Sequence, residues 1–358
     1  MTGLLEQRYR TVLRLLPASY RAEWEDELVA TYLHDADESE LDLARPELGE
    51  VASIAALAVR VRLAGPGGPP RFAALGSAVR TFAVLSLLLH AAGALTERAL
   101  TVAWFGGAEQ PQRALFLGAF TGQGLPRGAA EAVLWLLPLA WVGAYAALLR
   151  DRRRTAAVLA GLAALSAPAQ LLTGPPFPYA AVDTCFALLT VAAVCCGHHA
   201  EAPAARLPFL PPGAALLGAC VLMGGATVAW PRAADAVWGA GCAVLAAAAV
   251  WCAARFAAAR RGRSPEPPAD SPGLPLGLAA LAAAVLAQRT AALVQLTTAL
   301  HGTSGKGAGV LRPLLVGSEV QLALLAAAVA VLGVLGVRAL PAPPRVTAGA
   351  PPNAVRGG

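Results

Sequence analysis

Eight hydrophobic stretches, each about as long as a membrane-spanning helix, fill most of the chain between residues 75 and 337. A hydrocarbon core of roughly 30 Å is crossed by about 20 apolar residues in helical conformation. Because lipid offers no hydrogen bonds to the backbone, each stretch is expected to be a helix. We predict spans at residues 75–95, 130–149, 155–173, 179–197, 213–230, 234–254, 274–298 and 314–337.

The composition agrees with a protein that is mostly embedded in a lipid bilayer. Of the 358 residues, 57% are hydrophobic and only 14% are charged. Soluble domains usually have about 25% charged residues. The charged residues are much denser in the first 63 positions, which predicts one small soluble part and one large membrane part.

The first 63 residues have the spacing of amphipathic helices. Leucines at helical intervals end at Pro17, and Tyr20, Trp24 and Leu28 then recur every four residues. We therefore predict an all-α chain: a small cytosolic three-helix domain followed by a polytopic bundle of about eight spans. The expected domains are 1–63 for the helical domain, 64–74 for a Gly/Pro linker, 75–337 for the membrane domain and 338–358 for a disordered cytosolic tail.

The basic residues predict the orientation in the plasma membrane. Cytoplasmic segments next to membrane spans carry an excess of Lys and Arg. With both termini in the cytoplasm, the two densest clusters, residues 150–154 and 255–263, both lie on the inner side. The loop 98–129 then lies outside, and its two short apolar stretches, 101–105 and 114–120, are expected to be interfacial or re-entrant.

Polar residues inside the predicted spans are the best candidates for a site, because they are costly to insert in lipid. Arg289 lies well inside its span, and Glu319 is expected at a similar depth on the next span. One interpretation is an outward-facing polar pocket for a ligand or an ion. The other is a structural ion pair with hydrogen bonds between helices. The candidate residues are Arg289, Glu319, Asp183, Gln288 and His90.

Motifs for catalysis or metal binding are not recognisable. No HExxH and no GxSxG is present, and so we do not predict an enzyme. Cys195, Cys196, His198 and His199 are close in sequence, but neighbouring side chains on a helix diverge by about 100°. We predict no metal site and no cofactor.

The run RYRTVLRLLPASYRAEWEDELVATYL, followed by RPELGEVASIAALAVRVRL, carries a family resemblance. It resembles the cytosolic prefix of actinobacterial multi-pass membrane proteins, a HAAS-like or permease-prefix-like helical domain. Some proteins with such prefixes resemble permease components, and others are thought to act with PadR-like transcription regulators. The resemblance covers about 60 residues and implies no catalytic role for any residue here.

These observations favour two hypotheses on function over a third, a membrane enzyme, for which no site is visible in the sequence. In the first, the protein is a signalling or regulatory membrane protein that binds a cytosolic regulatory protein through residues 1–63, without contacting nucleic acid directly. The partner face would include Tyr9, Tyr20 and Trp24, although these aromatic residues also suit the core of a small helical domain. In the second, it is a transporter or permease subunit, with the polar residues lining the path.

Overall fold

The structure is a computed structural model that describes residues 4–34, 47–63, 70–107, 109–121, 125–173, 178–198, 236–261, 273–301 and 306–340. Within these ranges all regular structure is helical and no strand occurs, which confirms an all-α chain. The predicted span 213–230 lies outside the described residues, as do residues 64–69 of the predicted linker and 341–358 of the predicted tail.

Six helices within the described ranges are long and apolar enough to cross a membrane. They coincide with six of the predicted spans, and their length and apolar composition are those expected of membrane-crossing helices. Eight spans stay a prediction. The six are α4 (Pro70–Gly107), the continuous run of α6 (Leu125–Leu136), η1 (Leu137–Leu139) and α7 (Ala140–Leu149), α10 (Pro178–Gly197), α12 (Ala236–Arg260), α13 (Gly273–His301) and α14 (Lys306–Ala339).

The predicted span 155–173 is divided into two shorter helices, α8 (Arg153–Ala164) and α9 (Ser166–Thr173). The proline at position 168 has no backbone N–H, so the carbonyl of Ala164 loses the bond it would accept in an unbroken helix. The chain nevertheless keeps a helical course, because Leu165 N donates to Leu162 O at 3.1 Å. A proline break therefore explains why this stretch is not a single long helix.

Small residues let the helices of the bundle approach closely. Gly273 and Gly277 lie one turn apart on α13 and face α4. A Cβ atom at Gly277 would lie 2.7 Å from both the carbonyl oxygen of Ala78 and the Cβ of Thr81. Such pairs of small residues are typical of helix contacts in membranes. Alanines have the same role on α8, where Ala156, Ala160, Ala163 and Ala164 are all buried.

The outside of the bundle is apolar. Large aliphatic side chains on several of these helices are exposed, and in water they would form an unusually extensive apolar surface. A hydrocarbon surrounding removes this cost, as expected for helices of membrane length. Examples are Val133, Val158, Leu188, Leu189, Val250, Val294, Val331 and Val337.

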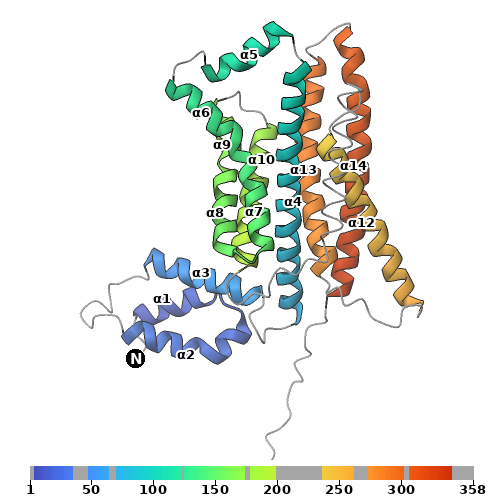
Figure 1. Cartoon of the computed structure of the whole chain (residues 1–358). Coiled ribbons are helices and arrows are strands. Elements are labelled where there is room, and N and C mark those ends of the chain that lie inside the picture. Colours follow the sequence, from blue (N-terminus) through green and yellow to red (C-terminus); the bar gives the residue numbers. More distant parts are fainter. Residues whose placement is uncertain are drawn as a thin grey trace, which may run out of the picture.

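The three N-terminal helices lie together at one end of the bundle (Figure 1). They are α1 (Leu4–Leu13), α2 (Ala18–His34) and α3 (Leu48–Arg62), and α3 contacts α4. The next helix starts at Pro70, so residues 70–74 are helical, although the sequence suggested a linker there. A core of their own joins α1, α2 and α3, formed by Tyr9, Leu13, Leu16, Val29, Ile54 and Ala58.

The turn between α7 and α8 faces the same end of the bundle as α1, α2 and α3 (Figure 1). Asp151 has a φ of 57°, a left-handed conformation that Asp tolerates better than most residues. Asp151 N donates to Leu148 O at 3.0 Å and Arg152 N donates to Ala147 O at 2.9 Å, which closes α7. The first basic cluster, residues 150–154, is therefore at this end.

At the opposite end of the bundle, α5 (Gln110–Thr121) and the start of α6 lie beside the end of α4, away from α14 (Figure 1). The stretch 101–105 forms the last turns of α4, so it is part of a long helix and not a separate loop element. The stretch 114–120 lies in α5, which contacts α6 at this end of the bundle.

Candidate functional site

Polar side chains join neighbouring helices inside the bundle. Gln288 Nε2 on α13 donates to Asp183 Oδ1 on α10 at 2.7 Å. Arg289 Nη2, also on α13, donates to Ser318 Oγ on α14 at 3.2 Å. His90 Nε2 on α4 and Thr190 Oγ1 on α10 are 3.3 Å apart. We call these six residues the polar layer: His90, Asp183, Thr190, Gln288, Arg289 and Ser318.

Arg289 is not joined to Glu319 in any ion pair between described residues, although the sequence suggested that these two residues lie within reach. Consecutive residues on a helix point about 100° apart. Ser318 is therefore buried and contacts Arg289, whereas Glu319 is exposed on another side of α14. The guanidinium group itself is buried, with 4% of the residue exposed.

Gln288 is fully enclosed in the polar layer, with 0% of its surface exposed. Its amide nitrogen donates a hydrogen bond to the carboxylate of Asp183, which is half-buried. Its Oε1 is buried and accepts no hydrogen bond from a described residue. A buried acceptor without a donor is costly. The amide and the carboxylate together therefore form a place where a donor, such as a water molecule or a proton-carrying group, would be stabilised.

His90 lies between two aromatic rings. Its ring stacks on Trp141 at 4.4 Å between centroids and lies 4.6 Å from the ring of Phe186. The hydroxyl of Thr190 donates to the carbonyl of Phe186 at 3.0 Å. Because that hydroxyl has only one proton, His90 Nε2 is the donor in the contact with Thr190. The histidine is therefore held by packing as well as by a hydrogen bond.

The three aromatic residues of the expected partner face differ in their surroundings. Tyr9 is a core residue, 3% exposed, and its ring stacks on Tyr32 at 3.9 Å. Tyr20 packs against the same core. Trp24 is 40% exposed, and its ring centroid lies 6.3 Å from that of Tyr20. Of the three, only Trp24 offers a large exposed surface to a partner.

Tyr9 also connects α1 to α3 through a polar contact. Its hydroxyl donates to Glu50 Oε1 at 3.3 Å. Burial, together with the nearby charge of Glu50, raises the pKa of Tyr9 to about 12. The hydroxyl therefore keeps its proton over the whole neutral range and remains a donor to the carboxylate.

Arg10 ties α1 to α2. Its guanidinium group lies 3.0 Å from Glu6, 3.3 Å from Glu25 and 3.1 Å from Asp26. One cation shared by three carboxylates fixes the orientation of the two helices more than it adds stability, because the group is solvated. The spacing of four residues between Glu6 and Arg10 is a signal for this ion pair that the sequence offers.

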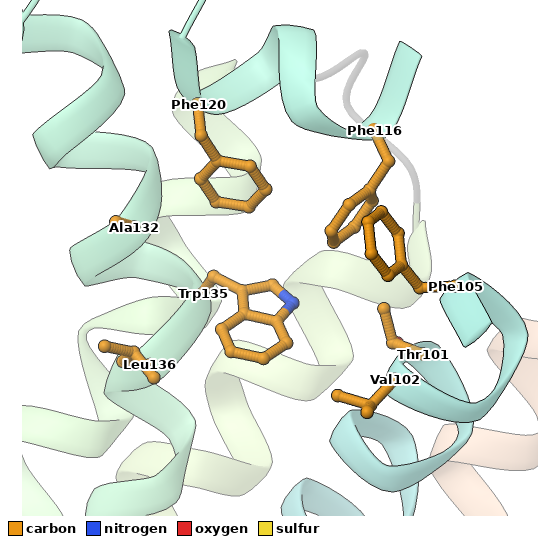
Figure 2. Close-up of a pocket in the computed structure, with 8 residues that line it drawn as sticks. All are labelled: Thr101, Val102, Phe105, Phe116, Phe120, Ala132, Trp135 and Leu136. Carbon is orange, nitrogen blue, oxygen red and sulfur yellow. The ribbon is translucent and has the colours of Figure 1, made fainter. Parts of the chain in front are cut away.

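A second candidate site lies at the other end of the bundle, where α4, α5 and α6 meet. The cavity there has a volume of about 350 Å³. Figure 2 shows three phenylalanine rings and one indole around it: Phe105 from α4, Phe116 and Phe120 from α5, and Trp135 from α6. We call this cavity the aromatic pocket. The sequence signal was the apolar stretch in α5, where Phe116 and Phe120 are one turn apart.

Two arginines stack on rings that line the aromatic pocket. Arg98 lies 5.2 Å from the centroid of the Trp135 ring, and its Nε donates to the carbonyl of Trp135 at 2.7 Å. Arg113 lies 5.8 Å from the centroid of Phe105, and its Nη2 donates to the carbonyl of Gly106 at 2.8 Å. Both guanidinium groups are within the range of cation–π contacts. The pocket is therefore apolar inside and has positive charge beside it.

No protein-family model, no curated protein and no solved structure matches this chain. The resemblance of the N-terminal run to permease-prefix-like domains therefore stays a prediction.

Proposed function

We propose that the protein is a multi-pass plasma-membrane protein that signals through α1, α2 and α3. The observation that carries this proposal is that these helices share an aromatic core of their own and leave Trp24 on the surface. Helices that satisfy their own core are not needed to complete the bundle. They are suited to a separate task, and binding a cytosolic regulatory protein is the task that an exposed tryptophan supports.

The proposed orientation has both termini in the cytoplasm and is supported by two basic segments. The turn between α7 and α8, residues 150–154, lies at the end of the bundle that α1, α2 and α3 occupy (Figure 1). The C-terminal end of α12 carries Arg255 and Arg260 and points to the same end of the bundle (Figure 1). Arg261 follows directly after this helix. Cytoplasmic ends of membrane helices are enriched in arginine. These segments therefore favour a cytoplasmic position for α1, α2 and α3.

Trp24 is expected to be the anchor of the partner interface. Tryptophan is enriched among residues that dominate binding energy, and truncating such a residue costs about 2 kcal/mol or more. We expect Trp24→Ala to reduce recovery of the partner by about 30-fold, because each 1.4 kcal/mol corresponds to a factor of ten. The measurement is affinity capture of the tagged full-length protein, followed by quantitative mass spectrometry.

Leu15→Ala is the matched control for this experiment, because Leu15 is 43% exposed, much as Trp24 is. The control should recover the same protein as the unmodified chain. If Trp24→Ala and the unmodified chain recover the same proteins in the same amounts, the proposed partner face is wrong.

The polar layer supports a second candidate function, the movement of a proton through the bundle. The specific observation is the buried Oε1 of Gln288, which accepts no hydrogen bond from a described residue and belongs to the same side chain that binds the Asp183 carboxylate. A carboxylate on a buried amide can take up and release a proton, and carboxylates inside membrane helices often have this role.

Proton movement is tested with the purified protein in liposomes that enclose a pH-sensitive dye. We expect a flux driven by a potassium-diffusion potential and its loss, by at least tenfold, in Asp183→Asn, because the amide cannot carry the proton. Glu319→Gln is the control, since Glu319 is exposed and takes part in no described contact with the polar layer. A wild-type flux no greater than that of empty liposomes rejects this second function.

A further inference from the structure

We propose that the aromatic pocket binds one acyl chain of an amphiphile with an anionic head group. This site goes beyond the proposed function, because binding at α4, α5 and α6 does not depend on whether α1, α2 and α3 have a partner. The lining of the pocket, the charge beside it and its position in the fold all favour such a ligand.

The lining fits an apolar chain. A volume of about 350 Å³ is near the lower end of the range for small-molecule sites, which is about 300–1,000 Å³. Thr101 is the one lining residue with a side-chain hydroxyl, and that hydroxyl donates to the carbonyl of Glu97 at 2.8 Å. The remaining lining side chains are aromatic or aliphatic, so they offer a polar ligand very little.

The head group is indicated by one of the two arginines beside the pocket, Arg113. Arg98 is largely neutralised, because its Nη1 lies 3.0 Å from Glu97 Oε2. Arg113 takes part in no ion pair with a described residue, and its Nη2 uses only a backbone carbonyl. A cation without a carboxylate partner, placed above a ring of the pocket, favours a negatively charged group at the entrance.

The position of the pocket supplies the route of entry. It lies at the end of a membrane-length helix, opposite α1, α2 and α3 (Figure 1). Val102 and Leu136 line it and are also 61% and 51% exposed, on the apolar outside of the bundle. A chain can therefore enter sideways from the hydrocarbon while its head group stays at the interface, where amphiphiles are most stable.

The test is photolabelling of the purified full-length protein in nanodiscs of phosphatidylcholine. The probe is a palmitate analogue with a diazirine at the end of its chain, and the labelled peptides are mapped by mass spectrometry. We expect labelling of residues 101–136 that unlabelled palmitate displaces. Phosphatidylglycerol that carries the same diazirine shows whether the chain comes from a phospholipid or from a free fatty acid. A fatty alcohol with the same diazirine shows whether the head group must be anionic.

Ala132→Trp is expected to fill the pocket and to reduce displaceable labelling at least tenfold. Val133→Trp is the matched control, because Val133 follows Ala132 directly, is 59% exposed and is not part of the lining. Arg113→Gln is expected to reduce labelling by the acid about threefold to tenfold, without an effect on the alcohol. Phe116→Ala is a second test on α5, outside the packed bundle, and should also weaken labelling.

The proposal is supported if the acid or phosphatidylglycerol labels residues 101–136 and if the variants reduce this labelling as expected. Whichever of the two probes labels the pocket identifies the source of the chain. The proposal is overturned if displaceable labelling in residues 101–136 is absent. It is also overturned if Ala132→Trp labels as strongly as Val133→Trp, or if the alcohol labels as well as the acid.

Discussion

Replacing Gly277 by leucine is expected to force α13 away from α4 and to destabilise the bundle by about 3 kcal/mol or more, at the upper end of the usual cost of overpacking. The reason is that the nearest obstacle is backbone: a Cβ atom would lie 2.7 Å from the carbonyl oxygen of Ala78. A side chain can rotate aside, but this carbonyl is fixed in the hydrogen-bond pattern of α4. The midpoint of thermal unfolding in detergent should fall by about 10 °C, as measured by fluorescence-detected chromatography.

The control for this prediction is Gly333→Leu on α14, where a Cβ atom would meet nothing within 4 Å. Leucine is a better helix former than glycine by up to about 1 kcal/mol, so this variant should be neutral or slightly stabilising. Equal midpoints for the two variants would contradict the close contact between α4 and α13.

The second large effect is expected for Tyr9→Ala, which removes a ring from the core of α1, α2 and α3. Truncating a buried aromatic side chain costs about 3–5 kcal/mol. The variant also loses the stacking on Tyr32 and the hydrogen bond to Glu50. In the full-length protein, hydrogen–deuterium exchange of peptides from α1, α2 and α3 should accelerate by about 100-fold or more, since 1.4 kcal/mol is a factor of ten.

Trp24→Ala is the control for Tyr9→Ala, because it truncates a surface aromatic residue in the same group of helices. Because Trp24 is 40% exposed, its truncation should change the exchange of these peptides by less than about tenfold. Exchange in α10 and α13 should be the same in both variants. If Tyr9→Ala leaves the exchange of α1, α2 and α3 unchanged, these helices do not depend on the core described here.

The sequence is a good guide to helices whose length and composition are fixed by the bilayer. The predicted spans 179–197 and 274–298 agree closely with α10 and α13, because apolar composition alone decides where such helices lie. It is a poorer guide where one residue changes the backbone. Pro168 divides a stretch that hydropathy treats as one span, and α4 continues beyond its apolar centre at both ends.

The candidate sites show what depth along a helix can and cannot predict. The position of Arg289 along its helix correctly predicted that its depth matches that of residues on α14. Its contact is Ser318 and not Glu319, because rotation about the helix axis decides which residue faces inward. The contact between Gln288 and Asp183 depends on the packing of α10 against α13, and a hydrophobic pattern does not contain that information. Tyr9 and Trp24 likewise look alike in sequence and differ in burial.

In the proposed topology, α1, α2 and α3 lie in the cytoplasm and the aromatic pocket lies at the outer interface of the membrane. The most direct test uses a full-length protein in which all six native cysteines are replaced by alanine. A single cysteine is then introduced at exposed positions, Glu23→Cys on α2 or Glu109→Cys before α5, and labelled with a membrane-impermeant maleimide. We predict that Glu109→Cys is labelled in intact cells and Glu23→Cys only after permeabilisation. Labelling of Glu23→Cys in intact cells would contradict signalling to a cytosolic partner.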